Sequence, residues 1–363
     1  MKRSPLYEVH QTLYATFTSV AGWELPQRFE DPQAEYQALR HGVGLCDLSH
    51  LGLVRITGKD RQRFLHAMVS NDTQSLQPGQ GCYATFLNVK GHLVADFRVY
   101  AEPEAYLLEM EPQVVRTFVE TLDTFIISED VVLHDESGIW GCLALQGPQA
   151  TELLTLALGQ AMPTLAPYAS VAAALAGHAI RCIQRSYTGE PGYILLTPAA
   201  ALLDVWQALW AHREACDARA VGLEMLDVAR IEAGMPVYGR DMSEETLPLE
   251  ANLDAAISYT KGCYIGQEVV ARIESRGHVN RKLVGLLLQG DALPASGATI
   301  ISPQREVGWI TSAAYSPARQ QNIALGYVRR EALTPGTSLE VQIQGQPLSA
   351  TVAALPFYPP APA

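Results

Sequence analysis

The chain changes character at one octet, Lys261-Gly262-Cys263-Tyr264-Ile265-Gly266-Gln267-Glu268. Two glycines, a thiol, a phenol, an amide and two charged groups share eight positions. Glycine destabilises helix and strand interiors, and Lys, Gln and Glu are rarely buried without partners. This mixture is typical of a binding or reaction loop, and it does not fit a packed core.

The segments on the two sides of the octet differ in pattern. Beyond Asn280, short apolar runs separated by turns predict a small all-β domain; they span residues 283–288, 308–312, 323–328, 339–343 and 350–352. Before the octet, strand patterns alternate with helical ones. Residues 140–146 form an apolar strand that leads into a helical stretch, which indicates a second unit built like the first. The fold class expected is α+β.

Bulk properties narrow the class of protein. The length of 363 residues predicts two or three domains. A net charge of −12 argues against a general nucleic-acid binder, which needs many basic contacts to phosphates. The N-terminus lacks the apolar core of a secretory signal, and no segment has the roughly 20 apolar residues of a membrane span, so we expect a cytoplasmic protein without membrane contact.

Metal chemistry has no support in the sequence. The six cysteines include no C-x-x-C pair, and the nine histidines show no ligand spacing, so no metal site is expected. A basic patch follows the octet and could meet an anionic ligand or could simply be solvated surface. Its members are Arg272, Arg276, Arg281 and Lys282.

Three polar residues could carry chemistry. Asp96 lies in a strand over residues 93–100 and faces the same way as Arg98, because side chains alternate along a strand; it is a candidate acid or base, or half of a plain ion pair. Glu190 lies between Gly189 and Gly192, where a carboxylate could accept two donors from an amino-heterocycle or could be a solvated turn residue.

Cys263 is the third candidate. Lys261 and the start of a helix beyond Gly266 would both favour a thiolate. The alternative is a small buried cysteine in a tight loop. Arg230 and Glu232 add a further puzzle, because charged residues at the end of an apolar helix must pair or bind something.

Nearly the whole chain resembles the folate-binding superfamily that contains the glycine-cleavage T protein and the YgfZ-type proteins linked to iron–sulfur enzymes. The T-protein likeness rests on the order and spacing of several segments: Ser4–Tyr7 with Gly22-Trp23, Cys46–Gly52, Asn88-x-x-Gly91 before Asp96, Tyr187–Glu190, and Arg230–Gly234. The octet, followed by Val270-Ala271-Arg272, resembles the YgfZ branch.

The resemblance implies three domains arranged as a cloverleaf around a central folate channel, the last domain being a β-barrel or jelly-roll-like module. We expect a discontinuous first α+β domain (1–50 plus 140–250), a second (51–139 plus 251–280) and the β domain (281–358). Tetrahydrofolate, or a one-carbon derivative, is the implied cofactor.

The resemblance also implies site residues. Asp96 matches the aspartate near the reacting folate nitrogen, and Tyr83 matches an aromatic wall. Glu190 and Arg230 match groups that hold the pterin, and Tyr187 belongs to the same binding motif. Cys263 stands where T proteins usually carry an acidic residue, and it is the implied functional thiol of the YgfZ branch.

Two functions follow from the resemblance. The first prediction is a tetrahydrofolate-binding protein of YgfZ type that supports iron–sulfur enzymes, with Asp96 and Cys263 as catalytic residues. The alternative is an aminomethyltransferase that takes a methylene group from an aminomethyl group on a lipoyl carrier protein. A folate binder without chemistry is a third reading.

Overall fold

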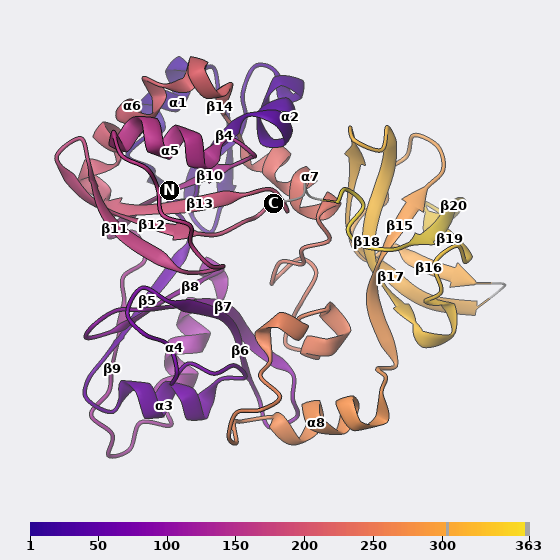
Figure 1. The fold of residues 1–363 in the computed structure, drawn as a ribbon. Helices are drawn as coiled ribbons and strands as arrows, with labels where there is room; N and C mark the ends of the chain where they lie inside the picture. The colour runs from indigo at the N-terminus through magenta and orange to yellow at the C-terminus, as the bar shows by residue number, and fades with distance from the viewer. Residues whose placement is uncertain (303–304, 360–363) are drawn as a thin grey trace.

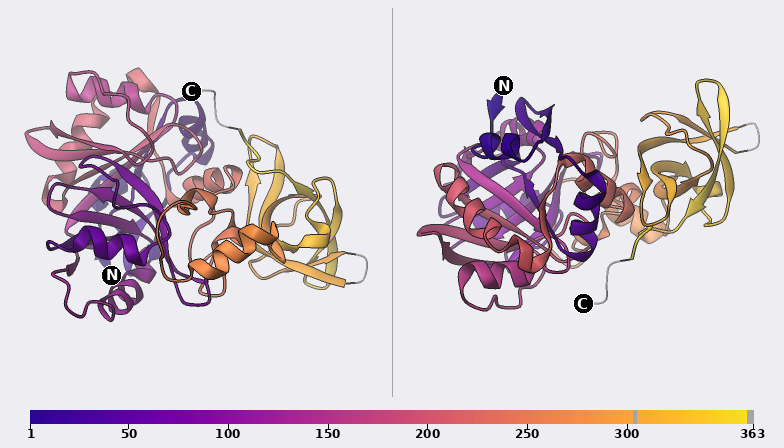
Figure 2. Two further views of the ribbon diagram at one scale, coloured as in Figure 1. Left: turned by 60° about the horizontal axis from the view of Figure 1, so that its bottom comes forward. Right: turned by 90° about the horizontal axis from the view of Figure 1, so that it is seen from above.

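The computed structural model describes residues 1–302 and 305–359. Two β-sheets, each covered by helices, and one β-barrel form three lobes (Figure 1). The first lobe is built on a six-stranded sheet, the second on a five-stranded sheet, and the third is a closed barrel of six strands. The prediction of an α+β protein with a C-terminal β-barrel is therefore confirmed. The views in Figure 2 show the barrel standing beside the other two lobes.

The six-stranded sheet has the order β11-β12-β13-β10-β4-β14. Its strands are β4 (Val43–Asp47), β10 (Trp140–Gln146), β11 (Ser170–Leu175), β12 (His178–Gln184), β13 (Gly192–Pro198) and β14 (Ala218–Ala220). Strands β4 and β10 are neighbours although 92 residues separate Asp47 from Trp140, since the chain leaves this sheet to build the second one and then returns. The predicted domain boundaries stay a prediction.

The five-stranded sheet has the order β6-β7-β8-β5-β9. Its strands are β5 (Gly52–Thr57), β6 (Gly81–Leu87), β7 (Leu93–Ala101), β8 (Tyr106–Met110) and β9 (Val132–Asp135). Alternation along β7 sends Phe97 and Val99 into the core beneath helix α4 (Val115–Asp123), where Phe97 meets Phe118 edge-on. The opposite face of β7 is left to Asp96 and Arg98.

The barrel closes in the order β15-β18-β17-β16-β19-β20 around its own apolar core. Its strands are β15 (Arg281–Leu288), β16 (Thr299–Ser302), β17 (Arg305–Ser316), β18 (Gln321–Arg329), β19 (Ser338–Ile343) and β20 (Gln346–Ala353). A small N-terminal sheet pairs β1 (Lys2–Arg3), β2 (Thr16–Val20) and β3 (Trp23–Arg28). Closure leaves the barrel without an unpaired edge strand.

Helices cover the sheets and connect the lobes. The α-helices are α1 (Tyr7–Thr12), α2 (Pro32–His41), α3 (Arg61–Met68), α4, α5 (Ala150–Leu158), α6 (Leu202–Trp210), α7 (Leu223–Glu232) and α8 (Gln267–Arg276). The 3-10 turns are η1 (Pro112–Val114), η2 (Ala199–Ala201), η3 (Arg213–Cys216), η4 (Pro248–Ala251), η5 (Asp254–Ala256) and η6 (Arg330–Ala332). No helix within residues 1–302 and 305–359 is long and apolar enough to cross a membrane.

The octet lies in the connection from the second lobe to the barrel, and α8 begins within it. Gly266 has φ of +81°, and a Cβ there would lie 2.7 Å from the carbonyl oxygen of Asn88, in the turn between β6 and β7. Glycine is required at this position by both the backbone angle and the close approach. The octet thus docks this connection against the β6–β7 hairpin.

Candidate functional site

The polar face of β7 holds a buried carboxylate that is only partly satisfied. One oxygen of Asp96, Oδ2, accepts a hydrogen bond from the Tyr83 hydroxyl at 2.8 Å and lies 3.3 Å from Nη1 of Arg98. Asp96 is 3% exposed, so this ion pair is not the surface pair considered from sequence. Its other oxygen, Oδ1, has no partner in the described part of the chain, and neither has Nε of Arg98.

Aromatic rings flank this carboxylate. The Arg98 guanidinium stacks over the Tyr83 ring at 4.2 Å, and the Tyr83 ring lies 6.4 Å from that of Tyr168. Burial, followed by the charge of Asp96, raises the pKa of Tyr83 well above its usual range, so its hydroxyl remains a donor. The β6–β7 register explains the grouping, because Tyr83 pairs with Arg98 and Thr85 with Asp96.

A second carboxylate, Glu109 on β8, continues the polar face toward the first lobe. It accepts hydrogen bonds from the hydroxyls of Tyr100 and Tyr187, the latter at 2.8 Å, and lies 3.5 Å from Nε of Arg185. Arg185 in turn stacks over the Tyr187 ring at 4.1 Å. The loop after β12 therefore brings Tyr187 to the same face as Asp96, which sequence spacing could not establish.

Sequence reasoning missed Glu109 and Arg185 as members of this cluster. The signal for Glu109 was available, because a glutamate inside the otherwise apolar run 106–110 must find partners when buried. Arg185 gave no comparable signal, since it precedes a turn-rich loop in which exposed charges are ordinary.

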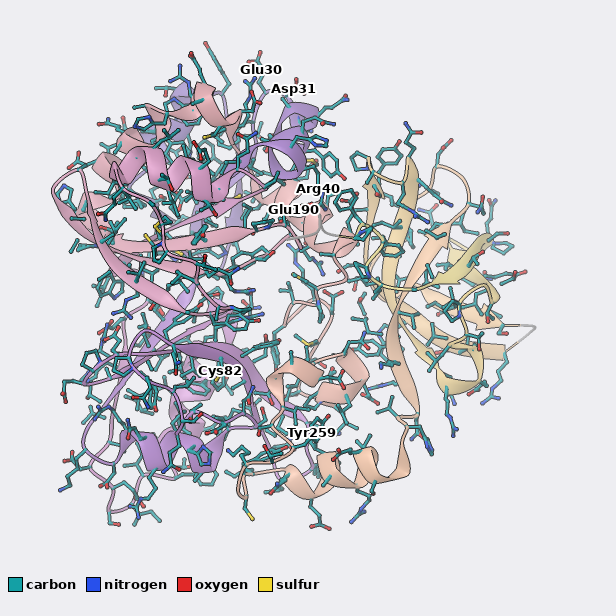
Figure 3. All side chains as sticks on the ribbon, viewed as in Figure 1. Glu30, Asp31, Arg40, Cys82, Glu190 and Tyr259 are labelled. Carbon is teal, nitrogen blue, oxygen red and sulfur yellow. The ribbon has the colours of Figure 1, made fainter. Side chains whose placement is uncertain are left out.

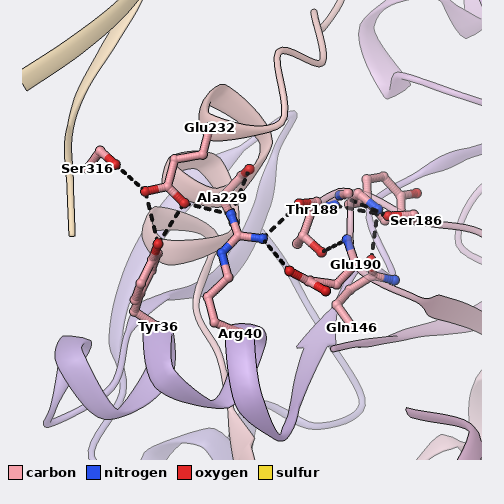
Figure 4. A network of polar contacts seen from close by, with 11 residues as sticks. Tyr36, Arg40, Gln146, Ser186, Thr188, Glu190, Ala229, Glu232 and Ser316 are labelled. Carbon is pink, nitrogen blue, oxygen red and sulfur yellow. Dashed lines mark hydrogen bonds and ion pairs between the residues drawn. The ribbon is translucent and has the colours of Figure 1, made fainter. Parts of the chain in front are cut away.

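Glu190 lies in a different network, which joins three elements (Figure 4). Nη1 of Arg40, on α2, lies 3.3 Å from Glu190, and Nη2 donates to Glu232 at 2.6 Å. Glu232 also accepts hydrogen bonds from the hydroxyls of Tyr36 and of Ser316 on barrel strand β17. Figure 3 shows Arg40 and Glu190 together next to α7, whereas the Asp96 strand belongs to the other lobe.

Arg230 is likewise engaged within the protein. It forms an ion pair with Asp241 and donates to Oγ of Ser312 on β17 at 2.7 Å and to Asp227 at 2.8 Å. The expectation that Arg230 and Glu232 must pair or bind is thus answered by two ion-pair networks around the end of α7, each of which includes a hydrogen bond to a serine of barrel strand β17. The structure brings Asp96, Tyr83 and Tyr187 to one face, but it ties Glu190 and Arg230 to other partners.

Cys263 is exposed, and no hydrogen bond in the described residues joins it to Lys261. The Lys261 ammonium instead donates to carbonyl oxygens at the end of α3, those of His66 and of Val69, the latter at 2.6 Å. Burial lowers the pKa of Lys261 to about 8. The geometry therefore gives the lysine a role in fixing α3 to the octet.

Replacing Lys261 by Met should lower the free energy of unfolding by about 1–3 kcal/mol, because two partly buried carbonyls at a helix end lose their donor. Urea denaturation followed by tryptophan fluorescence would measure the loss. Lys90→Met, at an exposed hairpin turn, is the control. Equal midpoints for the two variants would contradict the assignment.

The basic patch is partly neutralised within the chain. Arg272 pairs with Glu268 at 2.8 Å and Arg281 with Glu250 at 3.1 Å. The side chain of Arg276 lies outside the described residues. Among residues 1–302 and 305–359, no group of three or more His, Cys, Asp or Glu is arranged to hold a metal ion.

Comparison with known proteins gives the family. Residues 6–261 match the GCVT N-terminal domain, and residues 281–359 match the glycine cleavage T-protein C-terminal barrel domain. The chain belongs to the glycine cleavage T-protein family. It is 33% identical to an aminomethyltransferase of Desulforamulus reducens, covering 99% of this chain and 98% of that protein.

Other relatives agree with this membership. An aminomethyltransferase of Saccharopolyspora erythraea is 34% identical, with 98% of both chains covered. The crystal structure of glycine cleavage system aminomethyltransferase T from Bartonella henselae superposes with a TM-score of 0.89 at 25% identity, covering 99% of this chain and 98% of that one. This chain therefore has the fold of the solved T protein, as the resemblance predicted.

The first predicted function, a YgfZ-type protein that supports iron–sulfur enzymes, is wrong. Similarity to aminomethyltransferases runs over the whole chain, whereas the YgfZ prediction rested on one octet. The structure supplies the physical reason for that octet: Gly266 is needed for close approach to the hairpin, and Lys261 fixes α3. Packing of this kind accounts for those residues without an iron–sulfur partner.

Proposed function

We propose that this T-protein family member is an aminomethyltransferase that moves a methylene group to tetrahydrofolate from an aminomethyl group carried on a lipoyl protein, with release of ammonia. The alternative prediction from sequence is therefore the one retained. Its main support is the match to aminomethyltransferases over 98–99% of the chain, together with the partly satisfied Asp96.

The residues around Asp96 fit a reduced pterin. A pterin is a planar, amino-substituted heterocycle with N–H donors, and an unpaired buried carboxylate oxygen is a suitable acceptor for one of them. The rings of Tyr83, Tyr168 and Tyr187 offer apolar walls for a planar group. The unpaired Oδ1 of Asp96 and Nε of Arg98 are the groups that a ligand would satisfy.

Within this proposal, Asp96 is the catalytic residue. Tyr83 and Arg98 hold its Oδ2, which leaves Oδ1 to accept a proton or a hydrogen bond from the folate nitrogen that forms the new bond to carbon. Tyr83 and Tyr187 bind the folate. Glu190 and Arg230 act by positioning: the Glu190–Arg40 pair ties the loop after β12 to α2, and Arg230 ties the end of α7 to Asp241 and to Ser312 of the barrel.

The proposal is tested by reconstituting the transfer with an aminomethyl-loaded lipoyl carrier protein and tetrahydrofolate. We expect ammonia and methylenetetrahydrofolate in equal amounts, dependent on this protein. Binding of tetrahydrofolate without ammonia release would instead support the folate binder without chemistry. If the protein neither binds tetrahydrofolate nor releases ammonia, the proposal is overturned.

Cys263 has no part in this proposal, so Cys263→Ser should leave the rate of ammonia release within about twofold of wild type, as expected for an exposed substitution. Its thiol is exposed on the loop before α8. The reconstituted assay measures the effect. A fall of more than tenfold in the rate of ammonia release would show that the thiol takes part in the reaction.

A further inference from the structure

Glu111 lies one residue beyond the end of β8, the strand that pairs with β7. The register pairs Arg98 with Glu109 and Phe97 with Met110, so the next position sets Glu111 opposite Asp96. The backbone of Glu111 is still extended, with φ of −63° and ψ of 136°. Opposite residues on one face of an antiparallel pair have Cβ atoms about 5 Å apart, so the Asp96 and Glu111 side chains start from neighbouring positions on the same face.

The Asp96 carboxylate can accept a hydrogen bond that a protonated Glu111 could donate. Oδ1 of Asp96 is buried and lacks a donor among residues 1–302 and 305–359. A carboxylate oxygen has two lone pairs, so Oδ1 can accept one hydrogen bond from Glu111 and another from the folate nitrogen. Glu111 is half-buried. A protonated carboxyl group is a donor, whereas two ionised ones in this position would repel.

The groups that face Glu111 come from three elements. Asp96 and Arg98 lie on β7, Glu109 on β8, and Arg240 in the segment after α7. Burial, followed by the charge of Asp96, raises the pKa of Glu111 to about 7, while Arg98 and Arg240 oppose the rise. Glu111 therefore gains or loses its proton within the physiological range.

Building on the tetrahydrofolate site proposed above, we propose that Glu111 is a positioning residue that carries a proton and donates it in a hydrogen bond to Asp96, so that the pair presents one negative charge to the folate. Loss of that proton removes the hydrogen bond and adds a second negative charge. Because folate itself is an anion, the deprotonated pair binds it less well. Folate binding then favours the protonated form, and above pH 7 it is accompanied by proton uptake.

Calorimetric titration with tetrahydrofolate tests this in the full-length protein. For wild type we expect the affinity to fall by up to about tenfold for each pH unit above 7, because one proton is linked to binding. Repeating the titration in buffers of different ionisation enthalpy should show protons taken up. Glu111→Gln keeps a donor but does not titrate, so its affinity should vary by less than about twofold and its proton uptake should vanish.

Glu104→Gln removes the same charge at an exposed position before β8 and should behave as wild type. If Glu111→Gln retains the pH dependence and proton uptake of wild type, the proposal is overturned. A measurement without ligand distinguishes failure of the carboxyl pair from failure of the proposed function. In carboxyl-carbon NMR titrations of the protein without folate, Asp96→Asn should lower the pKa of Glu111. An unchanged pKa overturns the carboxyl pair, even if wild type fails to bind tetrahydrofolate.

Discussion

Asp96→Asn should reduce the rate of ammonia release in the reconstituted transfer by about 10²–10⁴-fold, the usual contribution of a positioned acid or base. The amide retains an acceptor for the Tyr83 hydroxyl, which lies 2.8 Å from Asp96 Oδ2 in the native chain. It can no longer take a proton from the folate nitrogen. We therefore expect the maximal rate to fall more than the affinity for tetrahydrofolate, which separates a catalytic role from a binding one.

Asp123→Asn is the matched control for this change. Asp123 is exposed at the end of α4, so its substitution removes a charge from the same lobe without touching the polar face of β7. Its rate should stay within about twofold of wild type. An Asp96→Asn enzyme with wild-type activity would remove Asp96 from the mechanism while leaving the family membership intact.

Glu232→Ala should be strongly destabilising, with a loss of about 3–5 kcal/mol in the free energy of unfolding, as expected when one partner of a buried ion pair is removed. Arg40, whose side chain is about 1% exposed in the native chain, would lose the carboxylate that lies 2.6 Å from its Nη2. The hydroxyls of Tyr36 and Ser316 would lose their acceptor as well. Because these groups come from α2, α7 and β17, contact between the first lobe and the barrel should weaken.

Urea denaturation is the measurement, and the five tryptophans of the chain report on unfolding. Glu244→Ala, an exposed glutamate in the segment after α7, should change the midpoint little. A loss below about 1 kcal/mol for Glu232→Ala, the level of a surface pair, would show that the network contributes little to docking of the barrel.

Local pattern was sufficient for much of the architecture. The alternation in residues 93–100 correctly placed Asp96 and Arg98 on one face, because side-chain direction in a strand depends only on neighbouring backbone geometry. The runs beyond Asn280 likewise predicted a β domain, because short apolar strands between turns close most readily on themselves. Both inferences needed information from within about ten residues.

The octet shows what local pattern could not supply. Its glycines and lysine suggested reactive chemistry at Cys263, but Gly266 serves a close approach to Asn88, and Lys261 serves the end of α3. Those partners lie more than 170 residues earlier in the chain, and no property of the octet specifies them. A small residue required by packing and one required by a ligand look identical in a single sequence.

The sequence by itself determined the fold class, the family likeness and the candidacy of Asp96, since these follow from periodicity and from the order of segments. Only the tertiary structure decided which polar residues share a site. It joined Asp96 to Tyr83 by a hydrogen bond and Tyr187 to Glu109 by another, and it assigned Glu190 and Arg230 to ion pairs elsewhere. The physical reason is that a buried charge takes whichever partner the packing of distant segments places within reach, and strand register and lobe docking fix that choice.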